Sequence, residues 1–430
     1  MSDNSMSASA TQIKYENTLE YARSMDEQDA LKHYRNEFLF PKIEGKQCLY
    51  FAGNSLGLQP KKVRQFIVEE LEDWEKWGVE GHFEARHPWL PYHEFLTEST
   101  ARLVGAKPEE VVVMNTLTVN LHLMMVSFYR PDKKRFKILV EGGSFPSDKY
   151  AVDSQARFHG FNPKEAVVEL WPRPGEKTLR HEDIIAKIEE LNHSLAVVML
   201  GNVNYLTGQA FDLKNIAAAA HKAGAYCGTN LAHGAGNLHL KLHDWNLDFA
   251  MWCSYKYLNS GPGSLAGCFI HERHLGQKDI PRFEGWWGTN KKTRFQMGPD
   301  FDPIPTAEAW QLSNPPIFQL AALRASMELF DQATIGELRK KSEILTGYLE
   351  FLLEQMSSYI QITTPKDKTQ RGCQLSVTVG GDAKELVRDL SKKGVICDFR
   401  EPNIIRLAPT PLYNNFEDVF ELYKVLKSHS

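Results

Sequence analysis

Short apolar runs alternate with helical patterns between residues 109 and 271, and this rhythm limits the possible fold more than any other feature. The expected strands cover residues 110–115, 136–141, 196–200, 225–228, 248–253 and 264–271, and the helices between them cover 118–129, 181–192 and 212–222. Continuous apolar runs of this length are typical of strands that are buried on both faces. The pattern therefore predicts an α/β fold with a mostly parallel sheet and helices on both faces.

The sequence on either side of this region has a different pattern. One or two helices are expected over residues 13–40, and amphipathic helices over 61–77 and 92–104. After residue 316, two long helical patterns precede a mixture of short strands and helices, which is typical of a smaller α+β unit. We therefore expect an N-terminal helical segment (1–48), a large cofactor-binding domain (49–316) and a small C-terminal domain (317–430).

The charge and cysteine content exclude several classes of protein. The formal net charge is −4 at pH 7, which gives no electrostatic basis for binding nucleic acid or an anionic membrane surface. No apolar run reaches the ~18 residues of a membrane span, and the polar residues 1–12 lack the apolar centre of a secretory signal. We expect a cytoplasmic protein whose six scattered cysteines are reduced.

Lys256 lies where one buried strand ends and a turn rich in glycine and proline begins. Tyr255 and Tyr257 flank it, and Ser260-Gly261-Pro262-Gly263 follows. Burial lowers the pKa of a lysine amine and makes it a nucleophile toward carbonyl groups. The alternative is a lysine at a solvated strand end, and this segment alone does not decide between them.

Polar residues at three other strand ends could bind a ligand, because ligands in open α/β sheets bind beyond the carboxyl ends of the strands. Thr118 is expected as the N-cap of a helix, where free N–H groups attract an anion. Phe145 could stack on a planar ring, with Ser147 and Asp148 as hydrogen-bonding partners. His233 could bind an oxygen atom. A plain N-cap, a simple turn and a core histidine are the respective alternatives.

Two later segments are also candidates. Trp286 and Trp287 lie in a glycine-rich stretch before Ser313-Asn314-Pro315-Pro316, and adjacent tryptophans of this kind line a pocket, line an interface or pack in the core. Arg406 lies in the otherwise apolar run 403–409. Its guanidinium suits a substrate carboxylate, and the alternative is a structural ion pair.

The motifs taken together resemble the kynureninase family, which are pyridoxal-phosphate enzymes of the aspartate-aminotransferase fold group (fold type I). The resemblance rests on FPSD at 145–148, LAH at 231–233, WCSYKYLN at 252–259 and SNPPI at 313–317, and it extends from Tyr50 to Pro409. It implies a homodimer that hydrolyses the β–γ carbon–carbon bond of L-kynurenine or 3-hydroxy-L-kynurenine. The products would be L-alanine and anthranilate or 3-hydroxyanthranilate, in the kynurenine pathway of tryptophan catabolism and NAD biosynthesis.

The resemblance also implies roles for individual residues. Lys256 would bond covalently to the cofactor aldehyde and move the α-proton of the substrate, and Tyr255 would handle a later proton transfer. The residues expected to bind the cofactor are Leu117, Thr118, Phe145, Pro146, Ser147, Asp148, Asn230, His233, Tyr255 and Lys256, with Trp286 and Asn314 from the partner subunit. The substrate would contact His82, Ser313, Asn314 and Arg406, and no metal is expected. The combination of His82, Ser313 and Asn314 implies a preference for the ring-hydroxylated substrate.

One position departs from the family pattern. The family has an aspartate where this chain has Asn230, and that carboxylate keeps the pyridine nitrogen of the cofactor protonated. A neutral amide cannot hold the proton by charge, and the loss of a charged hydrogen bond costs about 1.5–3 kcal/mol. Either Asp148 compensates for the missing charge or the ring accepts electrons less well.

Two alternatives to this function are considered. One is another fold-type I pyridoxal-phosphate lyase, such as a cysteine desulfurase, which carries a nucleophilic cysteine on a mobile loop. None of the six cysteines lies in an evident flexible loop rich in glycine or serine. The other is a non-catalytic relative that binds the cofactor, and Asn230 is its only support.

Overall fold

A central sheet of seven strands organises the computed structural model, which describes residues 13–429. The strand order is β6 (Val111–Met114), β12 (Ala266–Ile270), β11 (Phe249–Cys253), β10 (Tyr226–Asn230), β9 (Leu195–Gly201), β7 (Lys137–Glu141) and β8 (Val167–Leu170). β12 runs antiparallel to both of its neighbours, and the pairs from β11 to β8 are parallel. The predicted α/β class and mostly parallel sheet are confirmed.

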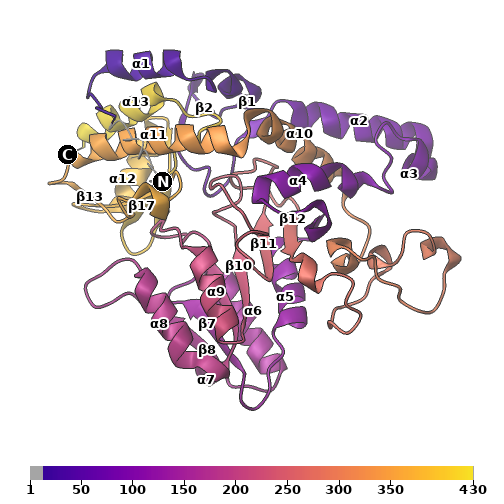
Figure 1. Cartoon of the computed structure of the whole chain (residues 1–430). Helices are drawn as coiled ribbons and strands as arrows, with labels where there is room; N and C mark the ends of the chain where they lie inside the picture. Colours follow the sequence, from indigo (N-terminus) through magenta and orange to yellow (C-terminus); the bar gives the residue numbers. More distant parts are fainter. Residues whose placement is uncertain (1–12, 430) are drawn as a thin grey trace, which may run out of the picture.

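Helices cover both faces of this sheet (Figure 1). Because successive side chains of a strand point to opposite faces, Leu139 joins one core whereas Ile138 and Val140 join the other. The first core is closed by α2 (Lys62–Trp77), α4 (Thr97–Val104), α8 (His181–Leu191), α9 (Leu213–Lys222) and α10 (Ile317–Ala333). The second is closed by α5 (Leu117–Phe128), α6 (Pro146–Phe158) and α7 (Pro163–Ala166).

The sequence patterns did not predict α6 and β8. The sequence of α6, PSDKYAVDSQARF, is polar over most of its length, and only four of its residues are buried, namely Ala151, Val152, Gln155 and Ala156. β8 is a four-residue edge strand with one buried residue, Val167. Elements that bury so little apolar surface leave a weak periodic signal.

A second, antiparallel sheet lies at the other end of the molecule, in the order β13 (Ile360–Ile362), β14 (Leu375–Val379), β17 (Ile404–Leu407) and β16 (Asp398–Arg400). It packs with α11 (Ile335–Glu354), α12 (Ala383–Lys392) and α13 (Phe416–Lys427). The N-terminal α1 (Leu19–Gln28) contributes Ala22 to the same core, and β4 (Leu49–Tyr50) pairs with β15 (Val395–Ile396). The proposed domain boundaries stay a prediction.

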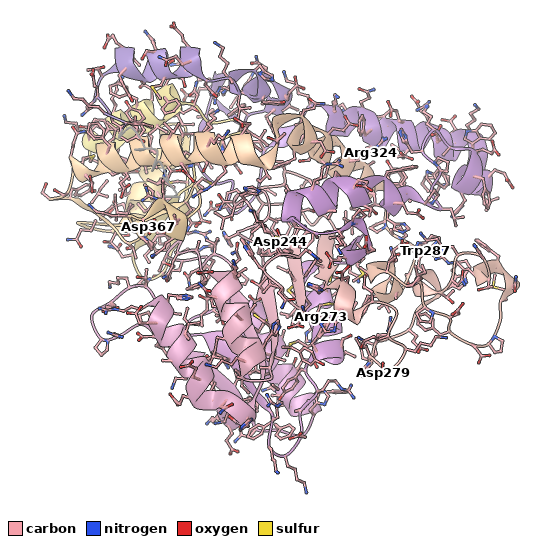
Figure 2. The ribbon with its side chains drawn as sticks, viewed as in Figure 1. Asp244, Arg273, Asp279, Trp287, Arg324 and Asp367 are labelled. Atoms are coloured by element: carbon pink, nitrogen blue, oxygen red, sulfur yellow. The ribbon has the colours of Figure 1, made fainter. Side chains whose placement is uncertain are left out.

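Besides an extended arm, the short strands and the short α-helix not yet named lie between residues 38 and 84. They are β1 (Phe38–Leu39), β2 (Lys42–Ile43), β3 (Lys46–Gln47), β5 (Gln59–Pro60) and α3 (Gly81–Glu84). The arm covers residues 276–316 and projects to the right in Figure 1. Figure 2 labels Asp279 and Trp287 in this arm, and the Trp287 side chain is buried whereas Trp286 is 41% exposed.

Residues 1–12, on which the expected polar start without a secretory signal rests, lie outside the described residues. Between residues 13 and 429, no helix is both long enough and apolar enough to cross a bilayer.

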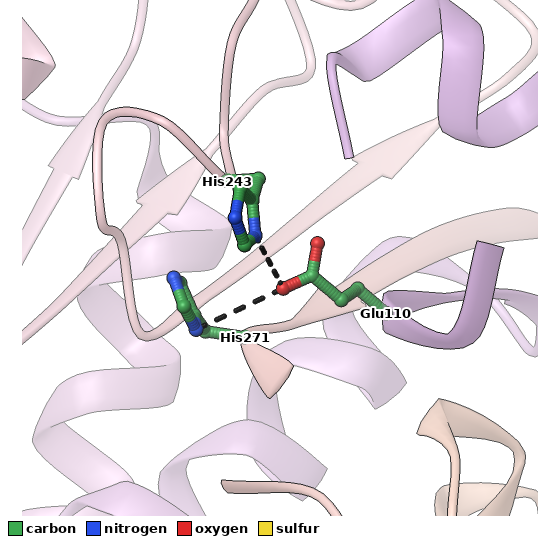
Figure 3. A group of neighbouring side chains, drawn as sticks. All are labelled: Glu110, His243 and His271. Carbon is green, nitrogen blue, oxygen red and sulfur yellow. Dashed lines mark hydrogen bonds and ion pairs between the residues drawn. The ribbon is translucent and has the colours of Figure 1, made fainter. Parts of the chain in front are cut away.

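A polar cluster of two buried residues and one half-buried residue lies at the amino-terminal end of the parallel strands. It consists of Glu110, His243 and His271 (Figure 3). Glu110 Oε1 accepts hydrogen bonds from His243 Nδ1 (2.9 Å) and from the backbone N–H of Glu272 (2.8 Å). The two imidazole rings stack with centroids 4.9 Å apart. We assign this cluster a structural role, because its carboxylate is held by hydrogen bonds within the chain.

Acid should weaken the fold through His271. Burial lowers the pKa of His271 to about 4, whereas an exposed histidine titrates near 6.5. The unfolded chain therefore binds a proton more readily, and stability falls as the pH drops from 6.5 to 4, by up to roughly 3 kcal/mol. We expect His271→Gln to remove this part of the pH dependence in denaturant melts at pH 7 and pH 4.5. His193→Gln, at an exposed position, serves as the control, and equal slopes in both variants would contradict the assignment.

Candidate active site

A cavity of about 180 Å³ opens at the carboxyl ends of the parallel strands. Five loops meet there because β6, β7, β9, β10 and β11 all end at this edge of the sheet. The cavity brings together nine of the predicted residues: Leu117, Thr118, Phe145, Ser147, Asp148, Asn230, His233, Tyr255 and Lys256. Thr116, Glu141, Gly201, Val203, Tyr205 and Ala232 line it as well and were not predicted from the sequence.

Lys256 and His233 contact each other inside this cavity. Lys256 Nζ lies 3.0 Å from His233 Nε2. Burial lowers the pKa of the Lys256 amine, and the positive charge of Arg406 lowers it further. Burial also lowers the pKa of His233 well below its usual value, with a smaller effect from the Lys256 charge. His233 is therefore neutral and accepts a hydrogen bond from the lysine, which leaves its buried Nδ1 without a partner among the described residues.

The N-terminus of α5 supplies an anion site, and its N-cap lies two residues earlier than predicted. The N-cap is Thr116 and not Thr118, because the backbone N–H of Asn120 bonds to the Thr116 carbonyl and the helix begins at Leu117. Thr116 makes no side-chain capping bond, so the first N–H groups remain free for an anion. The Thr118 hydroxyl lies 2.7 Å from the Ser147 hydroxyl. One of the two hydroxyl groups donates to the other, and the second keeps its proton free for an anion.

Phe145 and the start of α6 form the adjoining wall. The Phe145 ring is 44% exposed, and the Lys256 amine lies 5.9 Å from its centre. Tyr205 meets it edge to face at 5.2 Å. An exposed aromatic face beside a buried amine can stack on a planar ring. Pro146 occupies the first position of α6, where its fixed φ suits the helix, and does not line the cavity.

Asp148 and Asn230 contact each other directly. Asn230 Nδ2 donates to both carboxylate oxygens of Asp148, at 3.0 and 2.8 Å. The side-chain Oδ1 of Asn230 accepts a hydrogen bond of 2.8 Å from the backbone N–H of Ala232, which fixes the orientation of the side-chain amide. Burial raises the pKa of Asp148 to about 6, against the opposing effect of this amide. Asp148 is therefore an anion at neutral pH, which favours the view that it compensates for the missing carboxylate at position 230.

A carboxylate at position 230 should strengthen this side of the site. We expect Asn230→Asp to raise kcat for kynurenine by up to roughly tenfold, which corresponds to one pKa unit at the ring nitrogen. The reason is that two carboxylates stabilise a protonated ring better than one. Asn215→Asp, an exposed change on α9, is the control. Equal or lower turnover in Asn230→Asp would show that Asp148 alone already supplies the charge.

Arg406 lies behind the cavity wall in a carboxylate pair. Its Nε and Nη2 donate to Asp398 at 2.8 and 2.7 Å, and its Nη1 donates to the carbonyl of Tyr205 at 2.8 Å. Asp398 stands directly opposite Arg406 in the β16–β17 register. The structural ion pair considered from the sequence is thus present. The charge of Arg406 still acts on both Lys256 and His233, so a role toward the substrate stays a prediction.

Besides Pro146 and Arg406, four further predicted residues lie outside the cavity of this chain. His82 is in α3, where its Nδ1 lies 2.9 Å from the Val79 carbonyl and its ring meets Trp89 edge to face. Trp286, Ser313 and Asn314 belong to the arm and are exposed. The cofactor and substrate roles that the family resemblance implies for these residues therefore stay predictions.

The residues of the cavity fit pyridoxal phosphate. The uncapped helix end suits its phosphate, and the buried amine of Lys256, with its lowered pKa, suits its aldehyde. The Phe145 face suits the ring, and the Asp148 carboxylate suits a protonated ring nitrogen. The unpartnered Nδ1 of His233 leaves one more donor in the wall.

Known proteins are similar in sequence to this chain over almost its whole length. The chain is 63% identical over 422 residues to the kynureninase of Myxococcus xanthus, which covers 98% of this chain and 99% of that relative. The chain belongs to the kynureninase family. The kynureninase of Nematostella vectensis is 47% identical, with 95% and 93% of the two chains covered. Residues 338–426, which include α12 and all but the last residue of α13, match the family description "Kynureninase C-terminal domain".

Solved structures of other proteins share the fold of this family member. A cysteine desulfurase of Escherichia coli superposes with a TM-score of 0.75 at 17% identity, over 93% of this chain and 98% of its own. C-DES, solved with glycine covalently linked to its pyridoxal-phosphate cofactor, gives 0.73 at 17% identity, over 88% and 95%. At this identity the likeness concerns the fold alone. The desulfurase alternative is not favoured, because none of the six free cysteines lines the cavity.

Proposed function

We propose that this chain uses pyridoxal phosphate to hydrolyse the β–γ carbon–carbon bond of L-kynurenine, 3-hydroxy-L-kynurenine or both. Lys256 supports this most directly, because it is a buried amine of lowered pKa in the cavity of a kynureninase family member. The test is to incubate the purified protein with the cofactor and each substrate. Release of alanine together with anthranilate or 3-hydroxyanthranilate in equal amounts is expected. A protein that binds the cofactor but releases neither product would instead be a non-catalytic relative.

The bound cofactor would supply an aldehyde that captures amines and a ring that accepts electrons from the α-carbon. It would be held by the N-terminus of α5 with Thr118, Ser147 and Tyr255, by the Phe145 face and by Asp148. The chain itself must then orient the substrate and move protons at defined atoms. Water supplies the oxygen and hydrogen that complete the two products.

Lys256 is the base that removes the proton from the substrate α-carbon. Its amine must be uncharged for this, and burial favours the uncharged form by lowering the pKa of the amine. His233 remains neutral and accepts a hydrogen bond from the amine at 3.0 Å, so it orients the lone pair without adding a positive charge. Lys256 and His233 therefore act as a base and its positioning partner.

Tyr255 is suited to donate a proton rather than to accept one. Burial raises the pKa of its hydroxyl, and the neighbouring Cys253 raises it further. The hydroxyl therefore stays protonated at neutral pH and can give a proton to the three-carbon unit that leaves as alanine. Tyr255 and Lys256 both line the cavity, which supports this role.

We also propose a homodimer in the cytoplasm. The arm over residues 276–316 projects from the body and exposes Phe283, Trp286, Phe295 and Met297, each more than 40% exposed. Apolar side chains gathered on one projecting segment are typical of an interface. In the dimer, Trp286 and Asn314 would complete the cofactor site of the partner, while Ser313 and His82 would reach the aromatic end of its substrate.

The ring-hydroxylated substrate should be preferred because of His82. The ring hydroxyl needs a donor or acceptor in the pocket, and the Nε2 atom of His82 is free to supply one, since its Nδ1 faces the Val79 carbonyl. We expect the ratio of kcat/KM for 3-hydroxykynurenine over kynurenine to exceed one, and to fall about three- to tenfold in His82→Phe. His181→Phe serves as the control. A ratio that His82→Phe leaves unchanged would mean that His82 only packs against Trp89.

A further inference from the structure

A second buried carboxyl group, Glu141, lines the cavity beside Asp148. Glu141 is the last residue of β7 and is 5% exposed. Its Oε2 accepts a hydrogen bond of 2.9 Å from Asn204 Nδ2, and the backbone N–H of Gly201 donates to the same carboxyl. None of the roles described above involves this residue, although it faces the same space as Lys256.

The neighbouring strand leaves room for this carboxyl group. Gly201 is the last residue of β9, and a Cβ atom there would lie 2.9 Å from Glu141 Oε1. Carbon and oxygen atoms do not pack this closely, so a side chain at position 201 would displace the carboxyl. Two strand ends therefore define the position of Glu141. β7 ends in the acid itself, and β9 ends in Gly201, which leaves room for the carboxyl and donates its backbone N–H to it.

Each of the two acids is bound by an amide side chain. Asn204 donates to Glu141, and Asn230 donates to both oxygens of Asp148. Burial raises the pKa of Glu141 to about 7, and the charge of Asp148 raises it further. Asp148 titrates lower, near 6, because the Asn230 amide and the charge of Lys256 favour its ionised form. Of the other titratable groups of the wall, His233 is neutral, Tyr255 has a raised pKa and keeps its proton, and Lys256 has a lowered pKa. Two such carboxyls do not both ionise easily in a buried site.

We propose that Glu141 is a positioning residue that carries the proton of a Glu141–Asp148 pair and so leaves Asp148 as the single anion beside the cofactor ring. The pair then holds one proton and one negative charge. Above neutral pH Glu141 releases its proton to solvent, and a second negative charge appears next to the ring. This inference rests on the proposed function for the identity of the ring.

Infrared spectroscopy of the protein without substrate tests the first part. Difference spectra between pH 7 and pH 9, a range in which Asp148 is already largely ionised, should show a carbonyl band of a protonated carboxyl that is lost at pH 9. Glu141→Gln should remove that component, whereas the control Glu350→Gln, which alters an acid paired with Arg371, should retain it. A band that survives Glu141→Gln would overturn the assignment of the proton.

The absorbance of the bound cofactor tests the second part. A titration from pH 5.5 to 8.5 should show a step near pH 7 in the parent that Glu141→Gln loses while still binding the cofactor. If Glu141→Gln does not fold, Gly201→Ala replaces it, and its displaced carboxyl should move the step away from the parental pH. A step that stays unchanged in these variants would overturn the proposal.

The two experiments separate this proposal from the proposed function. Loss of the infrared component in Glu141→Gln requires neither cofactor nor turnover, so it would stand even if the protein released no anthranilate. Conversely, a protein that hydrolyses kynurenine and keeps the parental step in Glu141→Gln would retain the proposed function and exclude the role of Glu141.

Discussion

Lys256→Ala should abolish the covalent cofactor complex and nearly all turnover. The parent should bind pyridoxal phosphate in a form that borohydride reduces onto the peptide containing Lys256, and the variant should not. Turnover of kynurenine should fall by at least about 10²–10⁴-fold, the usual contribution of a positioned acid–base group. The effect is large because the same amine holds the cofactor and moves the α-proton.

The control for this experiment is a lysine far from the cavity. Lys222 at the end of α9 pairs with Glu189 at 3.6 Å and has a side chain that is 81% exposed, so Lys222→Ala should behave as the parent does. Cofactor absorbance, reduction by borohydride and kcat are measured on all three proteins. A Lys256→Ala protein that keeps a reducible adduct would assign the covalent role to another amine.

The sequence allowed prediction of the sheet and of much of the cavity, because the apolar runs that form the strands also mark where the strands end and the cavity begins. A strand buried on both faces is a continuous apolar run, and a binding site in such a sheet lies where the run ends. Lys256, His233 and Asp148 each follow a predicted strand, and the structure brings them to one edge. A short apolar run followed by polar residues therefore marked them as candidates, and the family resemblance assigned their roles.

Glu141 lines the cavity but was not predicted from the sequence. It ends the apolar run FKILVE, so its charge marked the strand boundary and no chemistry was assigned to it. Its proximity to Asp148 depends on the turn at 142–145 and on the start of α6, and α6 is too polar for its periodicity to reveal it. An acid at the end of a buried strand, opposite a glycine at the end of the next, is the signal that could have found it.

The sequence of a single chain does not specify the contacts of His82, Trp286 and Asn314. Their expected roles came from the family resemblance, and a single chain places them outside the cavity. No pattern within one chain specifies which surface of a second copy they approach. Arg406 is intermediate between these cases. Its need for an anionic partner followed from the sequence, but its pairing with Asp398 depends on the register of β16 and β17.

Arg406→Lys should weaken substrate binding strongly and leave the cofactor in place. A lysine keeps one positive charge but cannot pair with Asp398 through two donors and still reach the Tyr205 carbonyl, as the planar guanidinium does. The substrate α-carboxylate would lose a charge-assisted hydrogen bond. Such a bond is worth about 1.5–3 kcal/mol, which corresponds to roughly a 10- to 150-fold fall in kcat/KM.

Arg371→Lys is the matched control for this change. Arg371 also donates to a carboxylate, Glu350 at 2.6 Å, and to a carbonyl, that of Pro365 at 3.1 Å, but it does not line the cavity. The two variants should lose similar amounts of thermal stability, because both disrupt a buried pair. Only Arg406→Lys should raise KM and also weaken binding of the product alanine, which carries the same carboxylate. Equal KM values in the two variants would mean that Arg406 serves the fold and that another cation holds the substrate.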